Sequence, residues 1–420
     1  MVTVEVLAKR AATALVSVVI VLADGKANLV AAVGGDADEC RNVPGLPSHV
    51  QLNNGVSVPR IGFGTAGLGH ATEEAVSLAL TAGYRHVDTA QAQEWYREDA
   101  VGRAVRRATS AAEKLPPSRE GATSEEDHAK EAAALEGDGG GIADRAGGIQ
   151  AARLTSGVAT LSREDVFVTT KIHPRDFGIE RMTTVVNASN GNLQGIDLLL
   201  LHSPFCWPGS CPDNPTPWQD GWRELEKLYN KGAVRAIGVS NFSEDLLQEL
   251  LQMATVMPAA VQNWMDPFHQ DRAVRALCSK HGIAYVAYST LGGQWAHRPS
   301  SSSSPNPVSA DPTLEAIASA HGRSVHAVAL SWALQSGAII LPRSSNSERI
   351  GANLRTFVKG IDGTSSSIKD DDAKGSADDG GGGADQACRV GESKHGAAVH
   401  VFLTDEDVDA INRLDGTIGR

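Results

Sequence analysis

The feature that most constrains the fold of this chain is a repeated alternation of strand-like and helix-like segments. Helical spacing of apolar residues predicts helices at 73–82, 99–107, 222–230, 244–253, 271–281 and 347–354, with two more within 314–335. Short apolar runs predict strands at 59–65, 84–89, 166–171, 196–202, 236–240, 260–263, 284–288 and 339–342. About eight such alternations predict an α/β fold with a parallel sheet, either open and doubly wound or closed into a (β/α)8 TIM barrel.

The polar residues at the predicted strand ends favour the closed barrel. They are Asp88, Lys171, His202, Ser240 with Asn241, Gln262, Tyr288 and Arg343. In a barrel, the carboxyl ends of all the strands meet on one face, which carries the active site. In an open sheet, such residues would gather at one crevice between two strands. We therefore expect a single-domain barrel with its active site on this face.

The length of 420 residues alone would predict two or three domains. However, three segments are rich in Gly, Ser, Ala, Pro or charged residues and poor in apolar ones, at 109–153, 295–312 and 363–398. Such segments bury too little apolar surface to fold alone, so we expect low-complexity surface insertions. The remainder suits one barrel spanning 49–416, behind an N-terminal leader at 1–48.

The leader contains Lys9 and Arg10, followed by an uncharged run at 11–23. The run is shorter than the roughly 20 residues of a membrane span, and it has the pattern of a signal or transit peptide. The alternative is a β-strand, because VSVVIV is rich in β-branched residues. No later segment has an apolar run long enough to span a membrane. The leader therefore indicates the secretory pathway or an organelle; without it, we would expect the cytoplasm.

Net charge and cysteine spacing exclude several classes of site. The net charge is −12 with no basic stripe, which disfavours nucleic-acid binding. The five cysteines fit neither a zinc site nor a disulfide framework, and we expect no metal. Cys206 and Cys211 could pair in an oxidising compartment, but two ordinary loop thiols are the favoured interpretation. Glycosylation sequons begin at Asn187 and Asn241, and the latter lies among the strand-end residues.

A dinucleotide-binding motif offers a competing interpretation. Gly62, Gly64 and Gly67 spell GxGxxG, and Asp88 follows at roughly the expected distance. However, Pro59 interrupts the strand that should precede the motif, and the next predicted helix begins several residues after the last glycine. A pyrophosphate would then not lie at the helix N-terminus, so a glycine-rich strand and turn is the better interpretation.

Ten ordered pieces of the chain carry a family resemblance. They include PRIGFGTAGLG (59–69), AGYRHVDTA (82–90), REDVFVTTKI (163–172), IDLLLLHSP (196–204), PAAVQNWMDPFHQ (258–270) and ILPRSSNSERIGANL (340–354). The chain resembles the aldo-keto reductase family over nearly all its length outside the insertions. The resemblance implies an NAD(P)H-dependent carbonyl reductase on a (β/α)8 barrel without a Rossmann domain.

The resemblance also implies a catalytic tetrad of Asp88, Lys171, His202 and a tyrosine that donates the proton. In the family, the lysine, paired with the aspartate, lowers the tyrosine pKa toward the working pH. The usual tyrosine position, five residues after the aspartate, is Gln93, and counting back from Val101 gives Trp95 instead. We favour Tyr96, brought into the site by a bulge in the loop. The alternative is a cofactor-binding, regulatory relative with little or no turnover.

Further residues are implied to bind the cofactor and the substrate. The implied cofactor residues are Gly64, Thr65, Ser240, Asn241, Gln262, Tyr288, Ser289, Leu291, Arg343, Ser344, Asn346, Arg349 and Asn353. The implied substrate residues are Trp95, His173, Trp207 and Trp295. Two guanidinium groups beside the adenosine 2′-phosphate would favour NADPH over NADH. Aromatic loop residues indicate an apolar or planar small-molecule carbonyl, and we expect a monomer.

Overall fold

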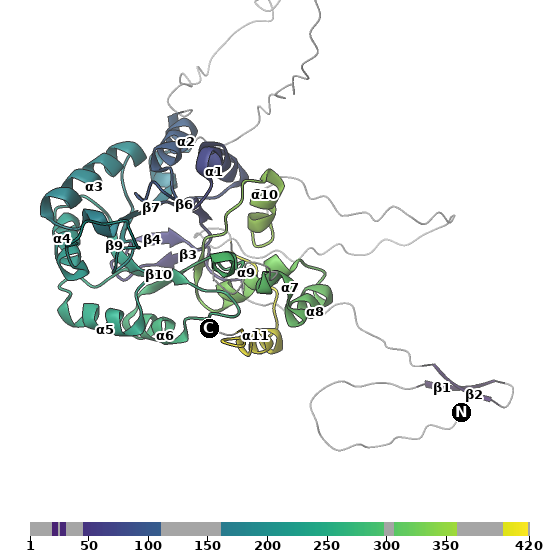
Figure 1. Ribbon diagram of the computed structural model, residues 1–420. Coiled ribbons are helices and arrows are strands. Elements are labelled where there is room, and N and C mark those ends of the chain that lie inside the picture. The colour runs from purple at the N-terminus through teal and green to yellow at the C-terminus, as the bar shows by residue number, and fades with distance from the viewer. Residues whose placement is uncertain are drawn as a thin grey trace, which may run out of the picture. The chain divides into compact units, whose positions relative to one another are not determined.

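The computed structural model describes residues 45–110, 161–297, 306–358 and 398–418, together with the backbone of two strands at 19–23 and 26–30 (Figure 1). The chain divides into two compact units, 1–44 and 45–420. Most of the predicted insertions at 109–153 and 363–398 lies outside the described residues. Thr109 and Ser110, however, complete a helix.

In the N-terminal unit, β1 (Val19–Ala23) and β2 (Lys26–Val30) form an antiparallel hairpin. The end of the apolar run at 11–23 therefore forms a strand, which was the alternative interpretation of this run. Whether residues 1–48 act as a leader stays a prediction. Of the helices in the described residues, none combines the length and the apolarity that a membrane crossing requires.

The second unit contains an eight-stranded parallel sheet whose strands follow one another in chain order. The strands are β5 (Phe63–Gly64), β6 (His86–Asp88), β7 (Phe167–Ile172), β8 (Leu198–Leu201), β9 (Ala236–Ser240), β10 (Ala260–Trp264), β11 (Ala284–Tyr288) and β12 (Ile339–Ile340). Ile61 forms a parallel bridge with Ile340, and the Gly62 amide donates to the Ile340 carbonyl at 2.8 Å. These bonds join the last strand to the segment before the first, which confirms the predicted barrel.

The helices surround the barrel (Figure 1). They are α1 (Thr72–Ala82), α2 (Glu98–Ser110), α3 (Ile179–Leu193), α4 (Trp218–Asn230), α5 (Glu244–Met253), α6 (Arg272–His281), α7 (Pro307–Ala310), α8 (Pro312–Ala320), α9 (Val325–Gln335), α10 (Ser347–Arg355) and α11 (Asp405–Asn412). Most predicted helices agree with these bounds to within a few residues. The sequence did not predict α3, whose stretch NASNGNL is poor in helix-forming residues.

Two separate apolar cores hold this arrangement together. The larger lies between the barrel and its helices, and the smaller fills the barrel interior. The inner core includes residues from the amino ends of the strands, such as Phe167, Leu198 and Ala236, and it packs against Leu52 and Val58 of the β3 (His49–Gln51) and β4 (Ser57–Pro59) hairpin. The hairpin therefore plugs the amino end of the barrel, and the carboxyl end is left for a site.

Close packing inside the barrel requires a glycine on β9. A Cβ at Gly238 on β9 would overlap the Ala260 carbonyl oxygen of β10 and lie 2.8 Å from Leu200 Cδ2. Any larger residue would have to push neighbouring backbone apart.

The segment expected as a loop at 295–312 is helical at both ends. The 3₁₀ helix η4 (Gly293–His297) contains the buried Trp295. Asn306 caps α7 (Pro307–Ala310), because its side chain accepts a hydrogen bond from the Val308 amide. The segment differs from the expected polar loop because the apolar side chains of Trp295 and Val308 are buried, which stabilises the helices at its two ends.

Candidate active site

A buried charge pair lies at the carboxyl ends of β6 and β7. Lys171 Nζ donates to Asp88 Oδ1 at 2.6 Å and to the Thr89 carbonyl at 2.9 Å. The Gln262 amide from β10 donates to Asp88 Oδ2 at 2.7 Å. Burial is the largest single effect and lowers the pKa of Lys171, but the charges and hydrogen bonds of Asp88 and Tyr96 together outweigh it and raise the pKa. Lys171 is therefore an ammonium group at neutral pH.

Tyr96 joins this pair, whereas its neighbour Trp95 does not. Lys171 Nζ lies 5.0 Å from the centroid of the Tyr96 ring, and the Tyr96 and His202 rings are 5.7 Å apart. Trp95 is 57 % exposed. The amides of both residues donate to the Ala92 carbonyl, so a tight turn accommodates the extra residues of this loop. The displaced tyrosine thus reaches the strand ends through a bulge.

The net shift of the Tyr96 pKa differs from our expectation. Burial raises this pKa, and the charge and hydrogen bond of Lys171 offset only part of that effect. Lys171 therefore lowers this pKa as expected, but the net pKa is raised. Burial outweighs the attraction because the phenolate would lose its hydration.

His202 follows β8 and contributes a neutral imidazole. Burial, followed by the charge of Lys171, lowers its pKa well below the ordinary value. Within the described part of the chain, its buried Nδ1 atom has no hydrogen-bond partner. A buried polar atom without a partner is costly, and a bound ligand could satisfy it.

The residues expected near the nicotinamide lie together at the ends of β9, β10 and β11. The Asn241 amide donates to the His202 carbonyl at 2.7 Å, and the Tyr288 hydroxyl donates to Asn241 Oδ1 at 2.6 Å. The Ser240 hydroxyl donates to the Gln262 carbonyl at 2.7 Å. These side chains are therefore held in place by one another.

The residues expected near the phosphate surround the start of α10. Asn346 caps this helix by accepting from the Arg349 amide at 3.0 Å, and the Ser344 hydroxyl accepts from the Asn346 amide at 3.0 Å. Arg343 and Arg349 are exposed, and neither forms an ion pair with a carboxylate among the described residues. The Arg349 guanidinium, in the first turn of α10, suits a phosphate group. The Arg343 guanidinium lies near Gly67, and its charge acts on Tyr96.

The remaining predicted cofactor residues have mixed surroundings. Thr65 is buried and its hydroxyl donates to the Asp88 carbonyl at 2.8 Å, while a Cβ at Gly64 would lie 3.0 Å from the Leu341 carbonyl oxygen. Ser289 has a φ of 54°, in the left-handed region, directly after β11. The others, Leu291 and Asn353, are half-buried.

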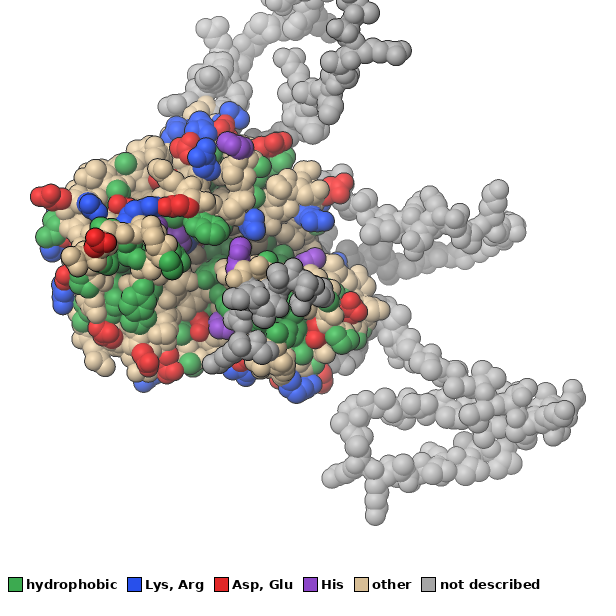
Figure 2. Space-filling model, in the orientation of Figure 1, with side chains coloured by type: hydrophobic (Ala, Val, Ile, Leu, Met, Phe, Trp, Pro, Cys, Tyr) green, Lys and Arg blue, Asp and Glu red, His purple; other side chains and the backbone are tan. Residues whose placement is uncertain are grey.

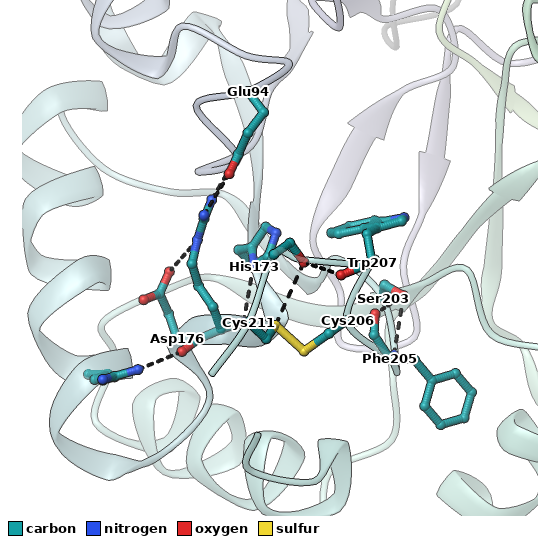
Figure 3. The surroundings of a disulfide bond; sticks show 11 residues. Glu94, His173, Asp176, Ser203, Phe205, Cys206, Trp207 and Cys211 are labelled. Carbon is teal, nitrogen blue, oxygen red and sulfur yellow. Dashed lines mark hydrogen bonds and ion pairs between the residues drawn. A yellow bond between two sulfur atoms is a disulfide. The ribbon is translucent and has the colours of Figure 1, made fainter. Parts of the chain in front are cut away.

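Two of the predicted substrate residues lie beside the cluster of Asp88, Lys171, Tyr96 and His202. The Trp207 ring centroid is 5.0 Å from those of His173 and His202. Figure 3 shows Trp207 beside His173. Trp295 instead is buried, and its indole donates to Asp266 at 2.8 Å. The structure does not bring Trp295 to the cluster, because this side chain packs against Trp264.

Cys206 and Cys211 are joined by a disulfide (Figure 3). The favoured interpretation, two ordinary loop thiols, is therefore wrong, and the alternative pairing holds. Their Cα atoms are 5.9 Å apart, a separation that a disulfide can span. Of the sequon asparagines, Asn187 is exposed on α3, whereas Asn241 lies inside the hydrogen-bonded network described above.

Sequence reasoning missed an ion pair at the rim of the site. Arg175, in the 3₁₀ helix after β7, donates to Glu94 through both terminal nitrogens, at 2.6 and 2.8 Å. Glu94 lies in the loop that carries Tyr96, so the pair connects two loops. The hydrogen bonds from Arg175 lower the pKa of the Glu94 carboxyl group to about 2. Nothing in the spacing of the two residues could have paired them.

Charged and apolar side chains are mixed over the visible face (Figure 2). A surface hollow of about 490 Å³ lies between the start of α3 and α4, away from the tetrad. Within the described ranges, no cluster of His, Cys, Asp and Glu could hold a metal ion.

Comparison with known proteins gives consistent matches. The model of the Aldo/keto reductase family matches residues 150–367. The chain is 31 % identical over 312 residues to 9,11-endoperoxide prostaglandin H2 reductase of Trypanosoma cruzi, covering 73 % of this chain and 85 % of that protein. It is 30 % identical over 316 residues to morphine 6-dehydrogenase of Pseudomonas putida, with the same coverage.

Solved structures show the same fold. The Bombyx mori aldo-keto reductase AKR2E4 in complex with NADP matches with a TM-score of 0.59 at 24 % identity, covering 88 % of this chain and 94 % of that one. An aldo/keto reductase from Brucella melitensis matches with a TM-score of 0.56 at 25 % identity, covering 88 % and 100 %.

Proposed function

Because the chain belongs to the aldo/keto reductase family, we propose that it reduces an aldehyde or ketone to an alcohol with NADPH. The observation that carries the proposal is the cluster of Tyr96, Lys171, Asp88 and His202 at the carboxyl end of the barrel. Relatives of this chain are named reductases and dehydrogenases, which supports an oxidoreductase.

A bound nicotinamide supplies the hydride for such a reduction. Tyr96 then donates a proton from its hydroxyl to the carbonyl oxygen of the substrate. Lys171 stabilises the developing phenolate by its charge, and Asp88 keeps Lys171 protonated. His202, which is neutral, orients the carbonyl oxygen through a ring nitrogen. Its pKa supports this role, because an imidazolium ion would compete with Lys171 for the same negative charge.

The chain's own residues fit NADPH. Asn241, Gln262 and Ser240 lie at the ends of β9 and β10 and would bind the carboxamide, and the half-buried Tyr288 offers a ring for stacking. Arg343 and Arg349 would hold the adenosine 2′-phosphate, which NADH lacks. We therefore expect tighter binding of NADPH than of NADH. Fluorescence titration with both cofactors measures this difference, and neutralising Arg349 should narrow it.

The substrate is proposed to be an apolar or planar carbonyl compound. The indole of Trp207 lies against His202, and Trp207 is 38 % exposed, so it offers apolar surface beside the expected carbonyl position. Phe205 is 63 % exposed in the same loop, but its ring points away from Trp207 (Figure 3).

NADPH oxidation with a panel of aldehydes tests the proposal. Tyr96→Phe should lower kcat by about 100-fold or more, because it removes a general acid. Trp95→Phe is the matched control and should keep most of the activity. If the protein binds NADPH but reduces no carbonyl compound, the alternative of a cofactor-binding protein without turnover replaces the proposal.

We also propose that the chain matures in an oxidising compartment and acts as a monomer. The disulfide supports the first point. The second is supported by a tetrad drawn entirely from one chain. Amino-terminal sequencing of the natural protein and light scattering test the two points; an intact Met1 in cytosolic protein, or a dimer mass, would contradict them.

A further inference from the structure

The loop after β8 carries a covalent cross-link beside the catalytic histidine. Cys206 is bonded to Cys211, and Trp207 lies within the ring that this bond closes. We propose that the disulfide fixes Trp207 as a specificity-determining side chain, so that a dithiol reductant weakens the reduction of aromatic carbonyls but spares small aliphatic ones. This inference rests on the proposed reductase function.

Trp207 lies where it can contact a bound substrate and so discriminate between substrates. Its ring packs against His173 and His202 at interplanar angles of 52° and 73°. Both histidines are buried, whereas Trp207 is partly exposed. Figure 3 shows the indole beside His173, while the ring of Phe205 points away. The indole therefore forms an apolar wall next to the ring that is expected to orient the carbonyl oxygen.

The loop has few other attachments. Its hydrogen bonds within the described structure stay inside residues 203–211: the Ser210 hydroxyl and amide both donate to the Trp207 carbonyl, and the Ser203 hydroxyl donates to the Phe205 carbonyl. Without the disulfide, only these internal bonds and the ring contacts would hold Trp207. The cross-link is thus what restricts the loop most strongly.

Reduction would undo this restriction in a balanced reaction. A dithiol transfers two electrons and two protons, the bond between the Cys206 and Cys211 sulfurs breaks, two thiols form, and the dithiol becomes a cyclic disulfide. The opened loop samples more conformations. An aromatic substrate must then order Trp207 on binding, whereas a small aliphatic substrate buries little surface against it.

The test compares two aldehydes with the oxidised full-length protein and NADPH. After treatment with dithiothreitol, or in the double variant Cys206→Ser/Cys211→Ser, kcat/KM for 2-naphthaldehyde should fall about fivefold, whereas that for propanal should change less than about twofold. Cys278→Ser is the matched control, because Cys278 is a buried free thiol on α6 whose pKa is raised to about 12 by burial. This variant should respond to dithiothreitol as the wild type does.

The Trp207→Ala variant tests whether reduction acts through the position of the Trp207 side chain or through a general increase in the mobility of the loop. In this background, reduction should have no further effect on either aldehyde. Equal losses for both aldehydes, no loss for 2-naphthaldehyde, or a persisting loss without Trp207 would each overturn the inference.

Tryptophan fluorescence gives a readout that is independent of activity. The difference between oxidised and reduced protein should be present in the wild type and lost in Trp207→Phe. If oxidised wild type reduces neither aldehyde, the proposed function fails, whereas the fluorescence difference still tests the tethering of Trp207.

Discussion

Replacing Asp88 with asparagine should destabilise the barrel strongly, because it leaves the Lys171 ammonium buried without a counter-charge. Lys171 is 1 % exposed and Asp88 is 3 % exposed, so solvent screens the pair very little. Breaking a buried ion pair by removing one partner costs about 3–5 kcal/mol. The Thr89 carbonyl, 2.9 Å from Nζ, would remain as a partner but supplies no charge. We therefore expect the free energy of unfolding to fall by about 3 kcal/mol or more at pH 7.

The pH dependence of stability should also change in a defined direction. In the wild type, the folded pKa of Lys171 is raised, so its contribution to stability is present below the unfolded value and is lost as the pH rises through the folded pKa. In Asp88→Asn, burial acts without the carboxylate and should place the folded pKa below the unfolded one. The unfolded chain then binds more protons, and the stability of the variant should rise with pH up to about 10.

Urea unfolding at pH 7 and pH 9 measures both effects. The double variant Asp88→Asn/Lys171→Met carries no unpaired buried charge, so it should be more stable than Asp88→Asn alone. A loss below about 1 kcal/mol in Asp88→Asn, or a double variant less stable than the single one, would refute the reasoning about the buried charge.

Three further outcomes follow from the structure. Glu94→Gln removes the charge of the pair with Arg175 and should lower the free energy of unfolding by no more than about 1 kcal/mol, because both side chains are partly exposed; stability at low and high salt checks this. Gly238→Ala should destabilise by about 3 kcal/mol in urea unfolding, because the added Cβ overlaps the Ala260 carbonyl; unchanged stability would contradict the packing. Burial lowers the pKa of His86 to about 4, so its contribution to stability falls as the pH drops from about 6.5 toward 4, by roughly 3 kcal/mol; His86→Gln should flatten that part of the curve.

The sequence was informative wherever a residue type was tied to a repeating element. Asp88, Lys171 and Gln262 lie at the carboxyl ends of predicted strands, and the carboxyl ends of parallel strands meet on one face of a barrel. The sequence therefore predicted that these three residues lie close together, but not which of them form hydrogen bonds with each other.

Loops were less predictable, because their conformation depends on contacts between distant segments. Tyr96 could not be placed by counting, since the turn at Ala92 absorbs the extra residues. Trp295 looked like a pocket residue, yet Asp266, in another loop, holds its indole in the core. The β3 and β4 hairpin was missed because its strands are short and one of them ends in proline.

That hairpin has a kinetic consequence. Because Leu52 and Val58 fill the amino end of the barrel, we expect the proposed cofactor and substrate both to enter at the carboxyl end. Of the proposed cofactor and substrate, the one that binds deeper in the site should bind first and dissociate last. We therefore expect an ordered sequence of arrivals and departures, with the smaller carbonyl compound exchanging while the larger dinucleotide stays in place.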